Sequence, residues 1–246
     1  MQKKTVSAII CAAVMIIGWY HKKDNRSENI IKNTTETNAP STANLASMTY
    51  HGTMVVKINH DQPSFKSSDM KAKTYIRLSS LDSLGRCGSN MMCAYYTNVP
   101  KTERGDISTV KPSGWHQSFI TKNRSRFALY NRSHLLMRKL SGLEANPQNL
   151  ITGTEQFNKR KGMLSVESQI LDYVERTKHH VVYRVTPVYK GNELVARGVL
   201  MEAKSVEDNN LSLCRYVFNV EDGVKIDYAT GYATASSSSV SVRRVN

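Results

Sequence analysis

Apolar positions in the second half of the chain predict one helix and several strands. Met163, Val166, Ile170 and Val174 are spaced three, four and four residues apart, which places them on one stripe of a helix. From Val181 to Pro187 apolar residues occupy alternate positions, as in a strand with one buried face. Further strands are expected at 193–203, 211–220 and 224–228. This order predicts an α+β fold with a substantial antiparallel sheet.

The N-terminus has a different pattern, in which Lys3 and Lys4 precede an apolar run from Val6 to Tyr20. As a helix this run is about 22 Å long, shorter than a ~30 Å hydrocarbon core, and its form is typical of an export signal. No small-x-small cleavage site follows, and Trp19 suits a membrane interface. The alternatives are therefore an uncleaved membrane anchor through residues 5–20 or a buried N-terminal helix.

Composition then suggests the domain boundaries. Residues 1–20 form the signal or anchor, and the polar stretch that follows predicts a flexible linker and peripheral segment over 21–71. A compact domain is expected over 72–232, with a Ser-rich tail over 233–246. Beyond the apolar run the cysteines are Cys87, Cys93 and Cys214, which permit one disulfide and one thiol without choosing the pair.

Charge narrows the classes of partner. The chain has 34 Lys and Arg against 20 Asp and Glu, a formal net charge of +14. Between Thr121 and Lys161 there are nine basic and two acidic residues, and their net charge of +7 is half of the excess of the whole chain. Such a local excess favours a polyanionic partner, namely nucleic acid, an anionic membrane or a cell-wall polymer. A soluble basic protein without such a partner is the alternative.

Several side chains in this basic region suit phosphodiester hydrolysis, which needs a base, a cation on the phosphate and a divalent metal. His134 and Arg132 lie two residues apart at the end of an expected strand, so they would point to one face. Asn149 and Asn158 carry amide oxygens that suit Mg²⁺, and Glu167 on the expected helix would hold a metal-bound water. The alternative for each of these side chains is an ordinary role as a structural residue, a helix or turn cap, or a solvated surface residue.

Seven short segments carry a resemblance that is more specific than any one of these residues. They are LDSLGR (81–86), PSGWH (112–116), YNRSHL (130–135), NLITGT (149–154), GML (162–164), YRVTP (183–187) and IDYATG (226–231). From about Tyr75 to Thr230, two thirds of the chain, the sequence resembles the ββα-metal nonspecific DNA/RNA endonucleases. The branch it resembles most contains DNA-entry nucleases and secreted bacterial DNases.

The resemblance implies a ββα-metal nuclease motif and a role for four matched residues. His134 matches the general base and Arg132 the arginine that faces the scissile phosphate. Asn158, which follows His134 by 24 residues, matches the single direct Mg²⁺ ligand. Glu167 matches the helix glutamate that orders the water shell of the metal.

Two departures accompany this match. Asn131 and Ser133 replace the Asp and Gly of the widespread Asp-Arg-Gly-His form, although Asn-Arg-Ser-His also resembles the form in some secreted DNases. The stretch from Asn158 to Gly162 is one residue longer than the family form, which weakens the match of Glu167 more than that of Asn158.

We therefore expect an exported, Mg²⁺-dependent endonuclease that hydrolyses DNA with little sequence preference. Mn²⁺ is an alternative ion and RNA an alternative substrate. The protein would be extracellular or tethered to the outer face of the cytoplasmic membrane, and the sequence identifies no inhibitor protein. The residues expected to contact nucleic acid are Arg126, Lys159, Arg160, Lys161 and Arg184.

Two rivals from other classes stay open at this point. One is a non-catalytic, surface-tethered DNA-binding protein that serves DNA capture. The other is a secreted protein that places its basic face on anionic wall polymers or lipid. Both share the charge and the N-terminal segment, but neither would respond to EDTA.

Overall fold

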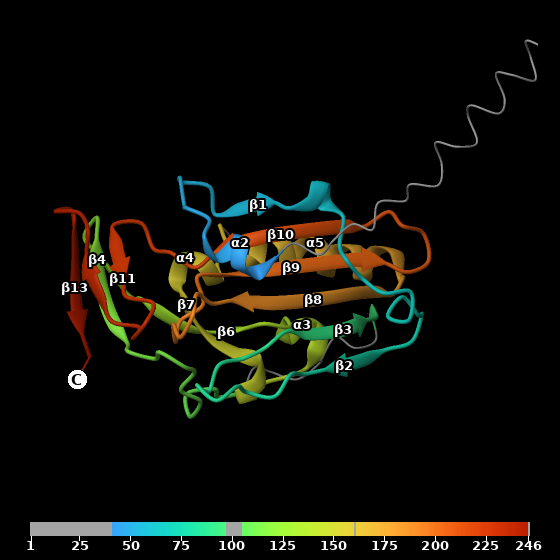
Figure 1. Cartoon of the computed structure of the whole chain (residues 1–246), viewed down its shortest axis with the longest axis horizontal. Coiled ribbons are helices and arrows are strands. Elements are labelled where there is room, and N and C mark those ends of the chain that lie inside the picture. The colour runs from blue at the N-terminus through green and yellow to red at the C-terminus, as the bar shows by residue number, and fades with distance from the viewer. Residues whose placement is uncertain (1–40, 97–104, 160, 246) are drawn as a thin grey trace, which may run out of the picture. The chain divides into compact units, whose positions relative to one another are not determined.

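A six-stranded antiparallel sheet with the order β1-β10-β9-β8-β3-β2 forms the centre of the fold (Figure 1). Its strands are β1 (Val55–Lys57), β2 (Tyr75–Arg77), β3 (Asn90–Ala94), β8 (Val181–Val188), β9 (Gly198–Ser205) and β10 (Ser212–Phe218). Because neighbouring strands are antiparallel, loops can join them without crossover helices, as they do from β8 to β9 and from β9 to β10.

The structure is a computed structural model that describes residues 41–96, 105–159 and 161–245. The residues from Ala39 to Asn246 belong to one compact unit. The expected signal or anchor over residues 1–20 lies outside the described residues. Within the described ranges, no helix combines the length and the apolar character needed to cross a bilayer.

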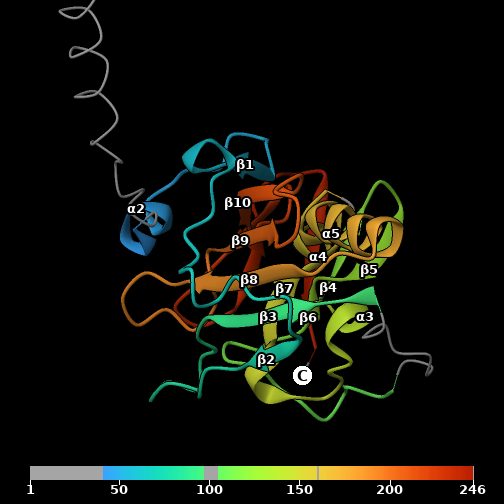
Figure 2. The same cartoon turned by 90° about the vertical axis from the view of Figure 1, so that its right-hand side faces the viewer.

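Helices cover both faces of the central strands, with α5 (Met163–Thr177) on one face and the short α2 (Thr42–Ala46) on the other (Figure 2). The four apolar residues predicted to form the helical stripe are all buried in α5, in one cluster with Val181, Tyr183 and Val185 of β8. On the opposite face Leu45 of α2 packs in a second cluster with Leu200 of β9. Coverage on two faces explains why β8 and β9 are buried at nearly every position, on both faces of the sheet.

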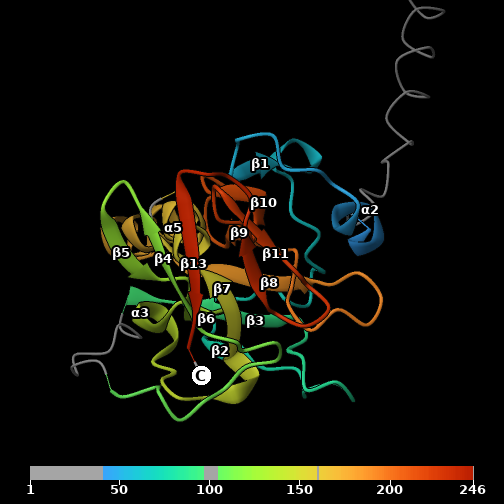
Figure 3. The ribbon, with the colours of Figure 1, turned by 90° about the vertical axis from the view of Figure 1, so that its left-hand side faces the viewer.

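Three smaller sheets flank this core (Figure 3). They are the pair β6 (Tyr130–His134) with β7 (Leu150–Thr154), the pair β11 (Val224–Ile226) with β12 (Ala233–Ala235), and the three-stranded sheet of β4 (Ser118–Lys122), β5 (Ser125–Ala128) and β13 (Val240–Arg244). The short helices are η1 (Asn59–Asp61), α3 (Arg138–Ser141), η3 (Pro147–Asn149) and α4 (Glu155–Asn158). A third apolar cluster, with Ile120, Tyr130 and Val240, joins β4, β6 and β13.

The structure adds detail to two predicted segments. In the expected linker and peripheral segment over 21–71, the described residues contain the short helix α2, and β1 is a peripheral strand that pairs with β10 at the edge of the central sheet. The expected Ser-rich tail over 233–246 contains β12 and β13, and β13 pairs with β4 along five residues. These elements have three to five residues each, too few to show a hydrophobic period.

The three cysteines of the described residues are all free and buried. Burial raises the pKa of the Cys87 and Cys214 thiols to about 12 and that of Cys93 to about 11. The Cys87 thiol donates to the carbonyl oxygen of Leu150 in β7. These cysteines are therefore packing residues, and they form no disulfide with one another.

The first two residues of β13 provide a test of whether residues 233–246 are a tail or a strand. Val240→Asp should lower the free energy of unfolding by roughly 3 kcal/mol, because it buries an unpaired charge beside Ile120. Ser241→Asp, on the exposed neighbour, is the matched control and should change it by under about 0.5 kcal/mol. Urea unfolding measures both, and equal stability of the two variants would show that the segment is frayed.

Candidate active site

The β6–β7 hairpin fixes the position of His134. In its register Arg132 lies opposite Thr152 and His134 opposite Leu150, so His134 ends the strand where β7 begins. Two residues further on, the Asn149 side chain binds the backbone of Leu136. Its Oδ1 accepts a hydrogen bond from the Leu136 amide at 2.9 Å, and its Nδ2 donates one to the Leu136 carbonyl oxygen at 3.0 Å. Asn149 is fully buried, so it clamps the chain beyond His134 instead of offering its oxygen to a metal.

A carbonyl oxygen determines the tautomer of the His134 ring. Nε2 lies 3.2 Å from the backbone oxygen of Glu144. Since a carbonyl only accepts hydrogen bonds, Nε2 must carry the proton, and a neutral ring then has its lone pair on Nδ1. This is the state of the ring that a general base requires.

Asn158 is the last residue of α4, and its place follows from the start of that helix. The Thr154 hydroxyl caps the helix by accepting from the Phe157 amide at 3.0 Å, and the buried Phe157 ring anchors it. Gly162 then allows α5 to begin against the end of α4, because a Cβ there would lie 1.9 Å from the Phe157 carbonyl oxygen. The Asn158 amide is half-buried and makes no side-chain hydrogen bond to the described residues.

Glu167 is a buried carboxylate on the second turn of α5, with 9% of its surface exposed. Within the described ranges it has neither an ion pair nor a hydrogen-bond donor. Burial raises the pKa of Glu167 to about 8. An acid placed this way is costly to the fold in its charged form unless a cation lies nearby.

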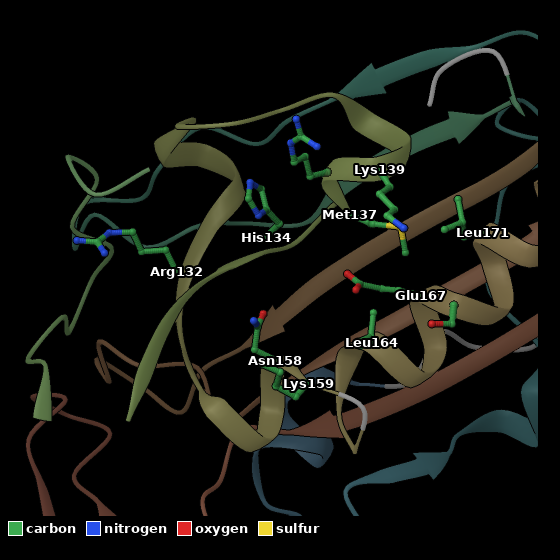
Figure 4. A pocket seen from close by; sticks show the side chains of 11 residues that line it. Arg132, His134, Met137, Lys139, Asn158, Lys159, Leu164, Glu167 and Leu171 are labelled. Carbon is green, nitrogen blue, oxygen red and sulfur yellow. The ribbon is translucent and has the colours of Figure 1, made fainter. Parts of the chain in front are cut away.

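These side chains line one hollow of about 360 Å³ (Figure 4). His134 reaches it from β6, Asn158 from the end of α4 and Glu167 from α5. Its rim is basic, with Lys139 and Lys159 on opposite sides in Figure 4. The hairpin, the short helix and the long helix thus bring together three residues that the sequence separates by up to 33 positions.

The donors in this hollow fit a hydrated divalent cation. An amide oxygen and a buried carboxylate are hard oxygen donors, and Mg²⁺ binds through few protein ligands while it keeps several waters. Among the described residues no group of three or more His, Cys, Asp and Glu side chains is arranged to hold a metal. Asn158 and Glu167 are therefore the residues that would hold an ion here.

Arg132 does not join His134 in the centre of the hollow. Its guanidinium donates to the carbonyl oxygens of Val110 and Ser108 and lies 4.2 Å from the centroid of the Trp115 ring. Figure 4 shows the side chain directed away from His134. The expected convergence of both side chains on one phosphate is absent from this arrangement, because acceptors in the 105–110 loop hold the guanidinium.

The structure places the residues that were expected to contact nucleic acid in different parts of the molecule. Lys159 lines the hollow and pairs with Glu155 at 3.1 Å, while Lys161 lines an adjoining hollow. Arg126 is exposed on β5. Arg160 lies outside the described residues.

Arg184 belongs to the interior and not to this surface. Its guanidinium pairs with the buried Glu202 carboxylate at 2.6 Å and donates to the Ser64 hydroxyl at 2.7 Å. The β8–β9 register places Arg184 directly opposite Glu202, so the pair is built into the central sheet. We leave Arg184 out of the nucleic-acid interface for this reason.

Two site residues were missed by the sequence analysis. Glu144 supplies the carbonyl that orients His134, and its carboxylate pairs with Arg138, which holds the pKa of Glu144 below its ordinary value. Lys139 adds charge to the rim from α3. Glu144 is one of only two acidic residues in the basic stretch 121–161, which is the signal that could have drawn attention to it.

Comparison with known proteins decides the family. Residues 63–207, more than half of the chain, match the family described as DNA/RNA non-specific endonuclease. The chain belongs to this family. The matched range contains all three residues at the centre of the hollow, and it ends before β10.

Relatives of this chain include a protein named Deoxyribonuclease from Streptococcus dysgalactiae subsp. equisimilis, which is 36% identical over 107 residues. That alignment covers 42% of this chain and 32% of the relative, so the match spans about a third of the length of the curated relative.

Solved structures support the fold class. NucA from Streptococcus agalactiae with magnesium bound superposes with a TM-score of 0.67 at 26% identity, covering 76% of this chain and 89% of NucA. The Sda1 nuclease with bound zinc superposes with a TM-score of 0.56 at 30% identity, covering 66% and 82%. The predicted α+β fold and the resemblance to ββα-metal nucleases are thereby confirmed.

The buried Glu167 carboxyl gives this family member a pH-dependent stability in EDTA. Below pH 4.5 Glu167 is neutral in both states; above it the unfolded chain ionises, while the folded chain keeps the proton up to about pH 8. The folded state then binds more protons, so stability falls as the pH rises through this window. Between pH 5 and 8 the free energy of unfolding of Glu167→Gln should therefore rise relative to that of the wild type, by an amount on the order of a few kcal/mol.

Urea unfolding at several pH values measures this gain. Gln169→Glu, on the exposed side of the same helix, is the control and should show no such trend. A constant difference between Glu167→Gln and wild type across the window would contradict the assignment.

Proposed function

We propose that this chain is an exported, metal-dependent endonuclease that hydrolyses phosphodiester bonds of DNA with little sequence preference. The observation that carries the proposal is the single hollow in which a histidine with its lone pair on Nδ1 faces a side-chain amide and a buried carboxylate. The name of one relative, Deoxyribonuclease, supports DNA as the substrate, and the name of the Sda1 nuclease supports a nucleic acid. RNA is the second substrate that the family description allows.

The proposed reaction is a one-step hydrolysis. Nδ1 of His134 takes a proton from a water molecule as that water attacks phosphorus in line, and the Glu144 carbonyl stabilises the imidazolium through Nε2–H. Asn158 would hold a divalent cation directly and Glu167 would hold it through water. When bound, the cation supplies positive charge to the phosphate and to the leaving oxygen. As the bond from water to phosphorus forms, the bond from phosphorus to the leaving oxygen breaks, and the leaving alkoxide takes a proton from solvent.

The remaining charge of the site positions the backbone. Lys139 and Lys159 on the rim lie where they would neutralise neighbouring phosphates, while Arg132 contributes its charge from the wall. Phosphates carry no base code, so contacts of this kind give binding with little sequence preference.

Magnesium is the ion that these donors favour. NucA contains magnesium and Sda1 contains zinc, which supports a divalent cation in both relatives. The hollow of this chain offers oxygen donors from Asn158 and Glu167 and no thiolate, a set that suits Mg²⁺ and also Mn²⁺.

Export is proposed from the N-terminal sequence. The pair Lys3 and Lys4 before the apolar run supports release from the cell or tethering to the outer face of the cytoplasmic membrane. Either location would bring the endonuclease into contact with extracellular DNA.

The decisive test is plasmid degradation with Mg²⁺, with and without EDTA. His134→Ala should lower the cleavage rate by about 100-fold or more, because it removes the general base. His116→Ala is the matched control, since His116 stacks on Tyr232 outside the hollow, and it should cleave like wild type.

Each other outcome has a definite meaning. Cleavage by His134→Ala at the wild-type rate would exclude the base assigned here. Cleavage that EDTA leaves unchanged would exclude a metal-dependent reaction. DNA binding by wild type without any cleavage would instead favour the DNA-capture protein.

Metal binding can be measured without activity. Added Mg²⁺ should raise the melting temperature of the wild type by roughly 5–10 °C at 100 times its Kd, because a ligand of the folded state stabilises it. Asn158→Ala should lose most of this shift. Asn192→Ala, in an exposed turn, is the control and should keep it. An undiminished shift in Asn158→Ala would place the ion elsewhere.

A further inference from the structure

The sheet β13-β4-β5 concentrates cations without any neighbouring carboxylate in its strands (Figure 3). Residues 118–128 and 240–244 contain Lys122, Arg124, Arg126, Arg243 and Arg244 and no Asp or Glu. None of these five forms an ion pair within the described part of the chain. By contrast, six arginines elsewhere in it are paired with carboxylates: Arg77, Arg86, Arg138, Arg184, Arg197 and Arg215.

Two of these arginines flank an aromatic ring on one face of the sheet. Phe119 of β4 pairs with Arg243 of β13 on one side, and the Arg126 guanidinium lies 4.2 Å from the centroid of the Phe119 ring on the other. With Arg244 and Val245 they line a hollow of about 330 Å³. Exposed guanidinium groups present planar, forked donors that match the oxygens of a phosphate.

The turn between β4 and β5 adds another arginine at a conformational cost. Asn123 and Arg124 form a two-residue turn in which both residues have positive φ, 52° and 63°. Such turns favour glycine at the second position, and an L side chain there costs roughly 1 kcal/mol. In spite of this cost, the residue at the tip of the hairpin is an exposed arginine, Arg124.

Cations connect this sheet to the catalytic hollow. A second hollow, of about 510 Å³, shares Lys159 and Leu164 with the first and is also lined by Lys161 and Lys122. Lys122 is the last residue of β4, beside the arginine turn. Three carboxylates also line this second hollow, and each has a partner: Glu155 pairs with Lys159, Glu221 accepts from the Gln156 backbone amide and Asp222 accepts from the Tyr50 hydroxyl.

We propose that the face of β13-β4-β5 binds the phosphate backbone of a second stretch of the same DNA duplex whose scissile phosphate lies near His134. This inference rests on the proposed function for the occupant of the catalytic hollow. A strand of five residues spans about 16 Å, or roughly five base pairs at 3.4 Å per pair, so the face adds several phosphates to the contact. The strand β13 lies beyond the range 63–207 that matches the family.

The turn offers a substitution that removes charge without harming the fold. Arg124→Gly places glycine where the turn prefers it, so stability in urea should equal or exceed that of wild type. Lys178→Gly is the matched control, because Lys178 is also exposed and left-handed (φ 59°) but ends α5 and lines none of the three hollows. Both variants lose one positive charge at a position that suits glycine.

The measurement is fluorescence anisotropy of a labelled duplex of about 30 base pairs, roughly 100 Å long, in EDTA at 50–200 mM salt. Arg124→Gly should weaken binding about threefold and lower the slope of log K against log salt by about 0.9. The double variant Arg126→Gln with Arg243→Gln should lower that slope by about 1.8. Lys178→Gly should bind like wild type.

The outcomes separate this inference from the proposed function. If wild type cleaves DNA but the arginine variants bind the duplex as tightly as it does, the inference fails alone. If wild type binds more tightly than the variants but never cleaves, the proposed function fails, and only the contact between this face and the duplex stands. Binding to vesicles that contain phosphatidylglycerol tests an anionic membrane as the alternative partner. If the arginine variants lose vesicle binding but bind the duplex like wild type, the proposal is overturned.

Discussion

The pairing of β6 with β7 is the constraint on which the site depends. Its register sets His134 against Leu150 at one end and Tyr130 against Thr154 at the other. The first pair brings Asn149 under the turn that follows the histidine, and the second starts the short helix that ends in Asn158. A shift of one residue would move every side chain of β6 to the other face. His134 and Asn158 therefore share one hollow only in this register.

The helix α5 serves the fold and the site with different faces. Its stripe from Met163 to Val174 packs against β8 and stabilises the central core. Glu167 lies one residue from Val166 on the same turn, and the packing that buries the stripe also removes water from the carboxylate. The fold thus tolerates a group that weakens it, and the gain is an oxygen donor fixed by a well-packed helix.

Much of the framework could be predicted from the sequence, because long elements repeat their signal. The 15-residue α5 and the strands β8 and β10 show several turns or alternations each, and all three were predicted. The strands β3 and β4 were not, since each has only five residues and shows no repeated alternation of apolar and polar positions. No strand was predicted at β7 either, because a glycine and two threonines lie within its five residues.

The site was predictable to the level of residues but not of directions. The order of the matched segments identified His134, Asn158 and Glu167, which line one hollow. Strand alternation gives the direction of a Cβ atom, whereas the long Arg132 side chain follows acceptors 22 and 24 residues away. Likewise only the β8–β9 register reveals that Arg184 lies opposite Glu202. Such partners are set by tertiary contacts and have no local signature.

The three buried thiols make the opening of this domain observable strand by strand. Cys87 donates to β7, Cys93 lies in β3 and Cys214 lies in β10, so each marks a different part of the molecule. An alkylating reagent reacts with the thiolate, and burial keeps all three protonated at neutral pH. Modification then requires local unfolding, and the rate at each position reports how often the hairpin at the catalytic hollow opens compared with the two strands of the central sheet.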